Sequence, residues 1–152
     1  MTTACARRFG WLFAGLLLVV SAAAAAGGYR QVVDGVAIYF GVLPAELVRG
    51  HPRAHPESEM HGGVPAGENH LVVALFDDKS GARIIRAEVT ATITGPGSFK
   101  AEKKLEPMVI ADAASFGNYF AMLGPGPYRI DLVIRLPGGT KSLRARFEWA
   151  RS

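Results

Sequence analysis

The chain has 152 residues, of which 49% are hydrophobic and 20% are charged, with a formal net charge of +4 and a single cysteine. This length suffices for one domain with its own core but not for two. One cysteine cannot form an internal disulfide, so the domain must be stabilised by apolar packing. The lysines and arginines are scattered and form no basic stripe, which argues against nucleic acid as a partner.

The N-terminus predicts a cleavable secretory signal peptide over residues 1–26. An Arg7-Arg8 pair precedes an apolar run at 9–20 (FGWLFAGLLLVV), and residues 21–26 (SAAAAA) are small enough for cleavage. The apolar run is too short to favour a permanent membrane span, although an uncleaved N-terminal anchor is the alternative. Cleavage would leave residues 27–152 as a single periplasmic domain without cysteine, and its net charge would fall to +2.

The remaining chain is rich in short apolar runs that predict β-strands. In chain order these are residues 36–43, 70–76, 88–94, 99–109, 117–123, 128–136 and 143–149. The first two are almost uniformly apolar, as expected of central strands. The runs at 88–94, 128–136 and 143–149 alternate apolar and polar side chains, as expected of strands with one solvated face. Residues 44–48 could form one helical turn.

Turn clusters rich in Gly, Pro and Asp separate these runs. Seven to eight short strands with regular turns predict an all-β fold, an immunoglobulin-like antiparallel β-sandwich. Tyr128 follows such a turn and opens an alternating strand two residues before the inward-facing Ile130. That position resembles the tyrosine corner of immunoglobulin-like sandwiches, and an ordinary strand tyrosine is equally compatible with it.

Residues 44–69 (PAELVRGHPRAHPESEMHGGVPAGEN) do not fit the strand pattern and predict one long loop. Loops of this length in a small domain are uncommon and are usually functional or disordered. All four histidines of the chain lie in or directly after this loop, together with one methionine: His51, His55, Met60, His61 and His70. Imidazole and thioether together favour copper, because sulfur suits Cu(I) and imidazole accepts either oxidation state. The alternative is that these histidines are merely solvated.

Outside the loop, Met108 is a further candidate ligand because it follows Glu106-Pro107 near a strand end, whereas Met122 has the pattern of a core residue. Catalytic motifs are missing from the sequence. It contains no Gly-x-Ser-x-Gly elbow, no His-Glu-x-x-His and no phosphate-binding glycine loop. We therefore expect a binding protein rather than an enzyme.

Residues 105–128 (LEPMVIADAASFGNYFAMLGPGPY) resemble the periplasmic copper-binding antigens that accompany bacterial high-affinity ferrous-iron permeases. Residues 35–43 (GVAIYFGVL) and the His70-Leu71 pair are similar to the first two core strands of that family. The resemblance implies an immunoglobulin-like sandwich, often dimeric, with a copper site near its surface and a role in iron acquisition.

The same resemblance implies a depleted ligand set. Met108 and His70 match a methionine and a histidine ligand of the family, whereas Val72 stands in place of a glutamate and Ser115 in place of a histidine. Phe116 and Gly117 keep the rest of the turn in which the family has that histidine. The loop histidines and Met60 would have to supply the missing ligands from the loop that precedes His70.

Together, these features predict a periplasmic accessory protein that binds copper or a similar metal and assists iron or copper uptake or homeostasis. The expected partners are the ion, a membrane permease or another periplasmic protein, and a second copy in a homodimer. The expected metal ligands are His70, Met108, His61, Met60, His55 and His51. The alternative from another class is an exported immunoglobulin-like interaction module without a metal role.

Overall fold

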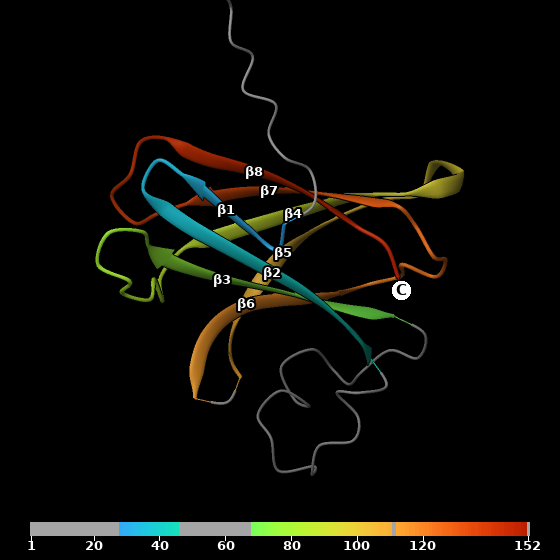
Figure 1. Cartoon of the computed structure of the whole chain (residues 1–152), viewed down its shortest axis with the longest axis horizontal. Helices are drawn as coiled ribbons and strands as arrows, with labels where there is room; N and C mark the ends of the chain where they lie inside the picture. The colour runs from blue at the N-terminus through green and yellow to red at the C-terminus, as the bar shows by residue number, and fades with distance from the viewer. Residues whose placement is uncertain (1–27, 46–67, 111, 152) are drawn as a thin grey trace, which may run out of the picture.

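The computed structural model describes residues 28–45, 68–110 and 112–151 (Figure 1). The predicted signal peptide and most of the predicted loop, with three of its histidines and Met60, lie outside these residues. The strands are β1 (Arg30–Val33), β2 (Val36–Pro44), β3 (Asn69–Asp77), β4 (Glu88–Thr94), β5 (Lys100–Ile110), β6 (Ala113–Phe120), β7 (Tyr128–Arg135) and β8 (Ser142–Trp149), with a 3-10 turn at Pro96–Ser98. In this part of the chain, no helix has the length and hydropathy needed to cross a membrane.

Six of the seven predicted strands agree with the structure to within one residue at each end. The prediction for 117–123 was wrong in its bounds, because β6 begins at Ala113 and the chain turns after Phe120, where the Met122 amide donates to the Phe120 carbonyl. Strand β1 was not predicted. It pairs with β2 through a two-residue turn, Asp34-Gly35, in which both residues have positive φ, as a tight hairpin requires.

The strand order confirms the predicted immunoglobulin-like sandwich. The eight strands are hydrogen-bonded in one continuous order, β1-β2-β3-β6-β5-β4-β7-β8, in which β2, β3, β6 and β5 form the first sheet of the sandwich and β4, β7 and β8 the second. Counted from β2, this is the order of the seven immunoglobulin strands, and β1 is an addition. Strand β5 pairs with β4 through residues 100–105 and with β6 through 106–110, so it belongs to both sheets.

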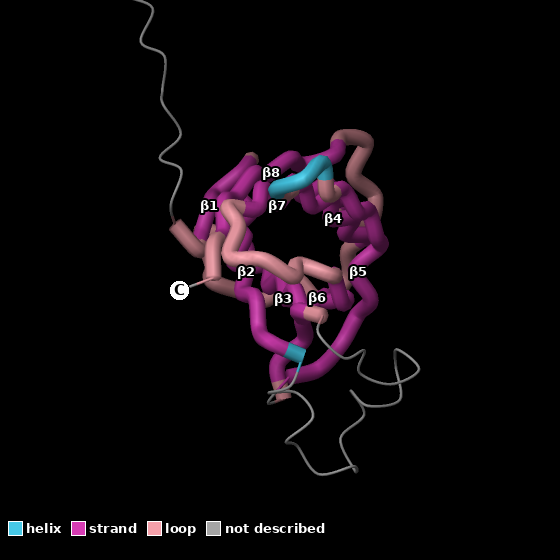
Figure 2. The backbone as a smooth tube through the Cα atoms, turned by 90° about the vertical axis from the view of Figure 1, so that its right-hand side faces the viewer, coloured by secondary structure: helices cyan, strands magenta, loops and turns pink. Residues whose placement is uncertain are grey.

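The two sheets also approach each other at their other edge. The Gln31 side chain donates to the Arg146 carbonyl (2.7 Å) and accepts from the Arg146 amide (3.2 Å), which links β1 to β8. The strands consequently form an almost closed ring (Figure 2). Its interior is filled by buried side chains from both sheets, the largest including Ile38, Leu71, Leu75, Ile93, Phe116, Phe120, Ile130, Leu132 and Ile134.

Tyr128 forms the tyrosine corner that the sequence left as one of two possibilities. Its hydroxyl accepts a hydrogen bond from the Gly124 amide at 2.9 Å. The buried ring lies between Phe99 and Trp149, with ring centroids 6.0 and 5.8 Å away. It also covers Gly95, where a Cβ atom would approach the ring to 2.4 Å. Tyr128 therefore fixes the β6–β7 connection to the end of the sandwich.

The turn after β3 supplies a prediction about acid stability. The Ser80 hydroxyl and amide both donate to Asp77 (2.6 and 2.7 Å), and these bonds hold the pKa of that carboxyl below its ordinary value of 3.8. A carboxyl whose pKa is lowered by folding adds stability above its ordinary pKa, and this is lost as pH falls through the lowered value. Ser80→Ala should raise the pKa of Asp77 part of the way back, because the amide bond remains. An NMR titration of side-chain carboxyls would measure this, and the other carboxyls in the same spectra should not move.

Candidate metal centre

The candidate site lies on the outer face of the first sheet, opposite the core. Side chains alternate along a strand, so the buried Leu71 places its two neighbours, His70 and Val72, on that outer face. On β5, buried Leu105 likewise places Glu106 and Met108 there. Strand β6 lies between β3 and β5, and its outward residues connect the two sets.

The ladder aligns these residues in three rows across the sheet. His70 pairs with Tyr119, and the two rings stack with centroids 4.5 Å apart and an interplanar angle of 22°. Met108 pairs with Ser115. In the middle row, Gly117 pairs with both of its neighbours, Val72 on β3 and Glu106 on β5.

Gly117 forms the floor on which two predicted ligands meet. A Cβ atom at this residue would lie 2.5 Å from Met108 Sδ and 2.7 Å from His70 Nε2. The separation of these two atoms cannot exceed the sum of those distances, although their residues come from different strands. Both side chains are buried, with exposed fractions of 4% for Met108 and 1% for His70. The site thus depends on a glycine, because any other residue would fill the space above it.

The donors at this point fit a soft or borderline metal ion. A thioether sulfur suits Cu(I), and an imidazole nitrogen accepts either oxidation state of copper. No group of three or more His, Cys, Asp or Glu side chains that could hold a metal occurs in the part of the chain that the structure describes. The pair found here consists of one histidine and one methionine, and the methionine thioether is a metal ligand of a different type from those four.

The other predicted positions divide into two groups. Val72 and Ser115, which the sequence resemblance aligned with a glutamate and a histidine ligand, both border the Gly117 floor but offer no carboxylate or imidazole. His51, His55, Met60 and His61 lie outside the described residues. Met122 is fully buried in the core, as predicted.

Sequence reasoning missed two residues of this cluster, Gly117 as the floor and Glu106 as a neighbour. Gly117 was noted only as part of a motif, and a residue without a side chain gives no chemical signal. Glu106 was noted only as the residue before Pro107. The available signal was its spacing of two from Met108, which places both side chains on one face of a strand.

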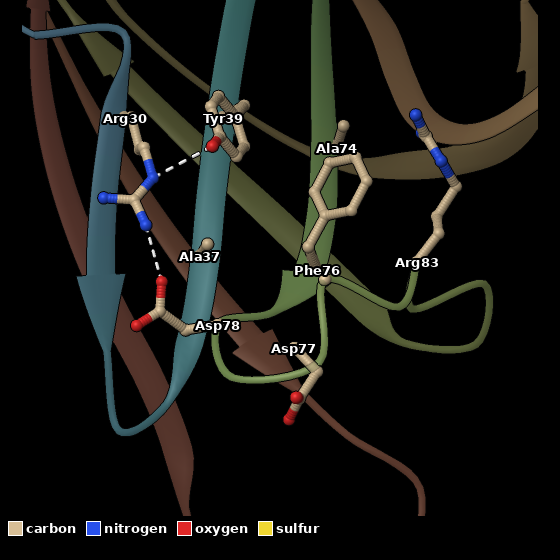
Figure 3. A pocket seen from close by; sticks show the side chains of 9 residues that line it. Arg30, Ala37, Tyr39, Ala74, Phe76, Asp77, Asp78 and Arg83 are labelled. Atoms are coloured by element: carbon tan, nitrogen blue, oxygen red, sulfur yellow. Dashed lines mark hydrogen bonds and ion pairs between the residues drawn. The ribbon is translucent and has the colours of Figure 1, made fainter.

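A hollow of about 390 Å³ lies further along the same outer face (Figure 3). Its aromatic walls are Tyr39 and Phe76, which meet edge to face with centroids 5.5 Å apart. At its rim, Arg30 donates to the Tyr39 hydroxyl at 2.9 Å and pairs with Asp78 at 2.5 Å. Because this arginine is already engaged within the chain, we assign no ligand to the hollow.

The described residues therefore define an immunoglobulin-like sandwich with a histidine and a methionine together on the outer face of one sheet. Neither a family model nor a curated protein matches the sequence. Solved structures do match the fold. A copper-bound variant of FetP from uropathogenic Escherichia coli strain F11 has a TM-score of 0.65 at 16% identity, covering 82% of this chain and 94% of that one.

Two other solved structures have a similar extent of overlap. A copper-bound variant of P19 from Campylobacter jejuni has a TM-score of 0.65 at 13% identity over 82% of this chain and 94% of that chain. A DUF4426 family protein from Pseudomonas aeruginosa has a TM-score of 0.60 at 11% identity over 81% and 94%. At these identities the comparisons establish a shared fold, which agrees with the fold that the sequence resemblance implied.

Proposed function

We propose that this protein is a periplasmic metal-binding accessory protein and that its ion is copper, held by His70 and Met108 above Gly117. The observation that carries the proposal is the approach of both donor atoms to one glycine from two different strands. Strand residues keep their positions better than loop residues do, so these two donors are preorganised. A bound copper ion would supply Lewis acidity and the ability to change oxidation state.

The remaining ligands in this proposal come from the loop that the sequence predicts before β3. His51, His55, Met60 and His61 lie between 9 and 19 residues before His70 in the sequence. A site built half from rigid strands and half from a loop suits a carrier that must release its ion to a partner. The ordinary nucleophile and base motifs are missing from the sequence, which supports a carrier over an enzyme.

The cellular context of the proposal rests on the N-terminus and on the fold. Residues 1–26 have the pattern of a secretory signal, which would deliver the domain to the periplasm. The copper-bound FetP and P19 structures share its fold, which supports copper as the ion, and the resemblance of residues 105–128 to the permease-associated family supports a role beside iron or copper uptake. A membrane permease or another periplasmic protein would be the partner, and a homodimer would be the assembly.

Titration of residues 27–152 with Cu(I) and Cu(II), by calorimetry and with a competing chelator, tests the proposal. Met108→Leu keeps most of the side-chain volume and removes the sulfur. Loss of an outer-shell partner alone typically costs 10–100-fold in metal affinity. Because Met108 is a direct ligand in the proposal, we expect the Cu(I) affinity of this variant to fall by at least about a hundredfold. His70→Ala should lose as much.

Met122→Leu is the matched control, because it makes the same change at a methionine in the core. Its copper affinity should equal that of the unaltered protein. Wild-type affinity after replacement of His61, His70 and Met108 together would overturn the proposal. Genomic proximity to an iron permease or a copper exporter would indicate which uptake system it serves.

A second candidate function is that of an exported interaction module. It is favoured by two side chains on the outer face of β2, Tyr39 and Leu43, which are 39% and 42% exposed. Exposed aromatic and aliphatic residues of this kind are common in interfaces. An unaltered protein that binds neither form of copper would leave this candidate in place of the first.

A further inference from the structure

The middle row of the candidate site contains one side chain with metal-donor atoms, that of Glu106. Gly117 has two neighbours in the ladder, Val72 on β3 and Glu106 on β5. Directly opposite residues in antiparallel strands have Cβ atoms roughly 4.5–5.5 Å apart. Because Gly117 has no side chain, the side chains that flank it can lean over it. Val72 has no donor atom, whereas Glu106 has two carboxylate oxygens.

The position of Glu106 in β5 places it on the same face of the sheet as the candidate site. Leu105 is 1% exposed and lies in the core, so Glu106 lies on the outer face, on the same side as Met108 two residues later. The Glu106 side chain is exposed, and no hydrogen bond or ion pair ties it to another described side chain. Glu106 could therefore bind an ion held at Gly117 without first giving up a contact with another described side chain.

We infer that Glu106 is a third ligand of the site and that the site therefore holds Cu(II) as well as Cu(I). The inference rests on the proposed function and adds a specificity to it. Thioether sulfur favours the soft monovalent ion, whereas carboxylate oxygen favours harder divalent ions, and imidazole accepts both. A set of one sulfur, one nitrogen and one anionic oxygen matches both oxidation states, and the carboxylate offsets part of the greater charge of Cu(II).

Glu106→Gln tests this assignment, because it keeps the shape of the side chain and removes the charge. The probes are Cu(II) and Ag(I), a monovalent soft ion that does not change oxidation state under the assay conditions. We expect Cu(II) affinity to fall by more than about tenfold, in line with the cost of losing a partner of the metal. Ag(I) affinity should stay within about threefold of wild type, and the Cu(II) electron paramagnetic resonance spectrum should change.

Two further variants make the test specific. Glu88→Gln removes the same charge from an exposed strand position on β4 and should leave both affinities unchanged. Val72→Glu combined with Glu106→Gln moves the carboxylate to the other flank of Gly117. This double variant should recover most of the Cu(II) affinity, which a general charge effect of Glu106 would not require.

The possible failures are distinguishable. Wild-type Cu(II) affinity in Glu106→Gln, combined with loss of binding in Met108→Leu, would overturn the role of Glu106 and leave the proposed function standing. Equal losses of Cu(II) and Ag(I) affinity in Glu106→Gln would overturn the specificity for the divalent ion. A protein that binds neither ion would overturn both proposals.

Discussion

Gly117→Ala is expected to weaken copper binding by at least about a hundredfold while leaving the sandwich folded. The added methyl carbon would lie 2.5 Å from Met108 Sδ, 2.7 Å from His70 Nε2 and 3.0 Å from the Leu71 carbonyl oxygen. The methionine is flexible and can retreat, so the cost of overpacking should be about 1–3 kcal/mol of the free energy of unfolding. The two donors would then be held apart by the methyl group, and we expect an affinity loss of at least about a hundredfold by analogy with ligand-shell mutations.

The matched control for this variant is Gly41→Ala. Gly41 lies on the same outer face in β2, paired with Val72, and a Cβ atom there would meet no atom within 4 Å. Its copper affinity and its thermal unfolding midpoint should both stay near those of the unaltered protein. Calorimetric titration and circular dichroism would measure the two quantities. Undiminished copper binding by Gly117→Ala would show that the ion lies elsewhere than above Gly117.

Removal of the Tyr128 side chain should have the largest effect on stability. Tyr128→Ala deletes a ring that is buried between Phe99 and Trp149 and that covers Gly95. Truncation of a buried aromatic residue typically costs 3–5 kcal/mol, and we expect a loss of about that size in urea-induced unfolding. Tyr128→Phe keeps the ring and removes the hydroxyl, which accepts from the Gly124 amide at 2.9 Å and donates to the Gly124 carbonyl at 3.4 Å, so it should cost about 1 kcal/mol.

Tyr39→Phe provides the control for the hydroxyl group. This tyrosine is partly exposed, and its hydroxyl accepts from the exposed Arg30 side chain, so its replacement should change the free energy of unfolding by less than about 0.5 kcal/mol. A cost for Tyr128→Ala no greater than that for Tyr128→Phe would contradict the role of the ring. The difference between the two Tyr128 variants therefore separates packing from hydrogen bonding at this corner.

Most of the fold could be predicted because the apolar period follows the strands closely. The alternation at 88–94 reproduces β4 without error, since each inward side chain there is buried and each outward one is not. The period gives no such guidance for β6, where Ser115 and Gly117 face outward and Asn118 interrupts the apolar pattern. Strand β1 has four residues and alternates weakly, and only the Asp34-Gly35 dipeptide marked its hairpin.

The candidate site could be predicted only as far as residue chemistry reaches. Imidazole and thioether side chains are recognisable as candidate ligands by residue type alone, so His70 and Met108 could be named from the sequence. Their meeting point depends on which residues of β3, β6 and β5 lie opposite one another, and the two donors are separated by β6 in space and by a long stretch of sequence. The row formed by Val72, Gly117 and Glu106 can be recognised only when the register of the three strands is known.

The shared strand β5 ties the chemistry of the site to the folding of the core. Leu105 and Met108 point to opposite faces, and the first is buried between the sheets while the second approaches Gly117. A slip of one residue in the pairing of a strand turns every side chain to the other face. Such a slip would bring Leu105 into solvent and both Glu106 and Met108 into the core. A one-residue insertion or deletion between Leu105 and Met108 would therefore take Met108 away from the site, although Met108 itself would be unchanged.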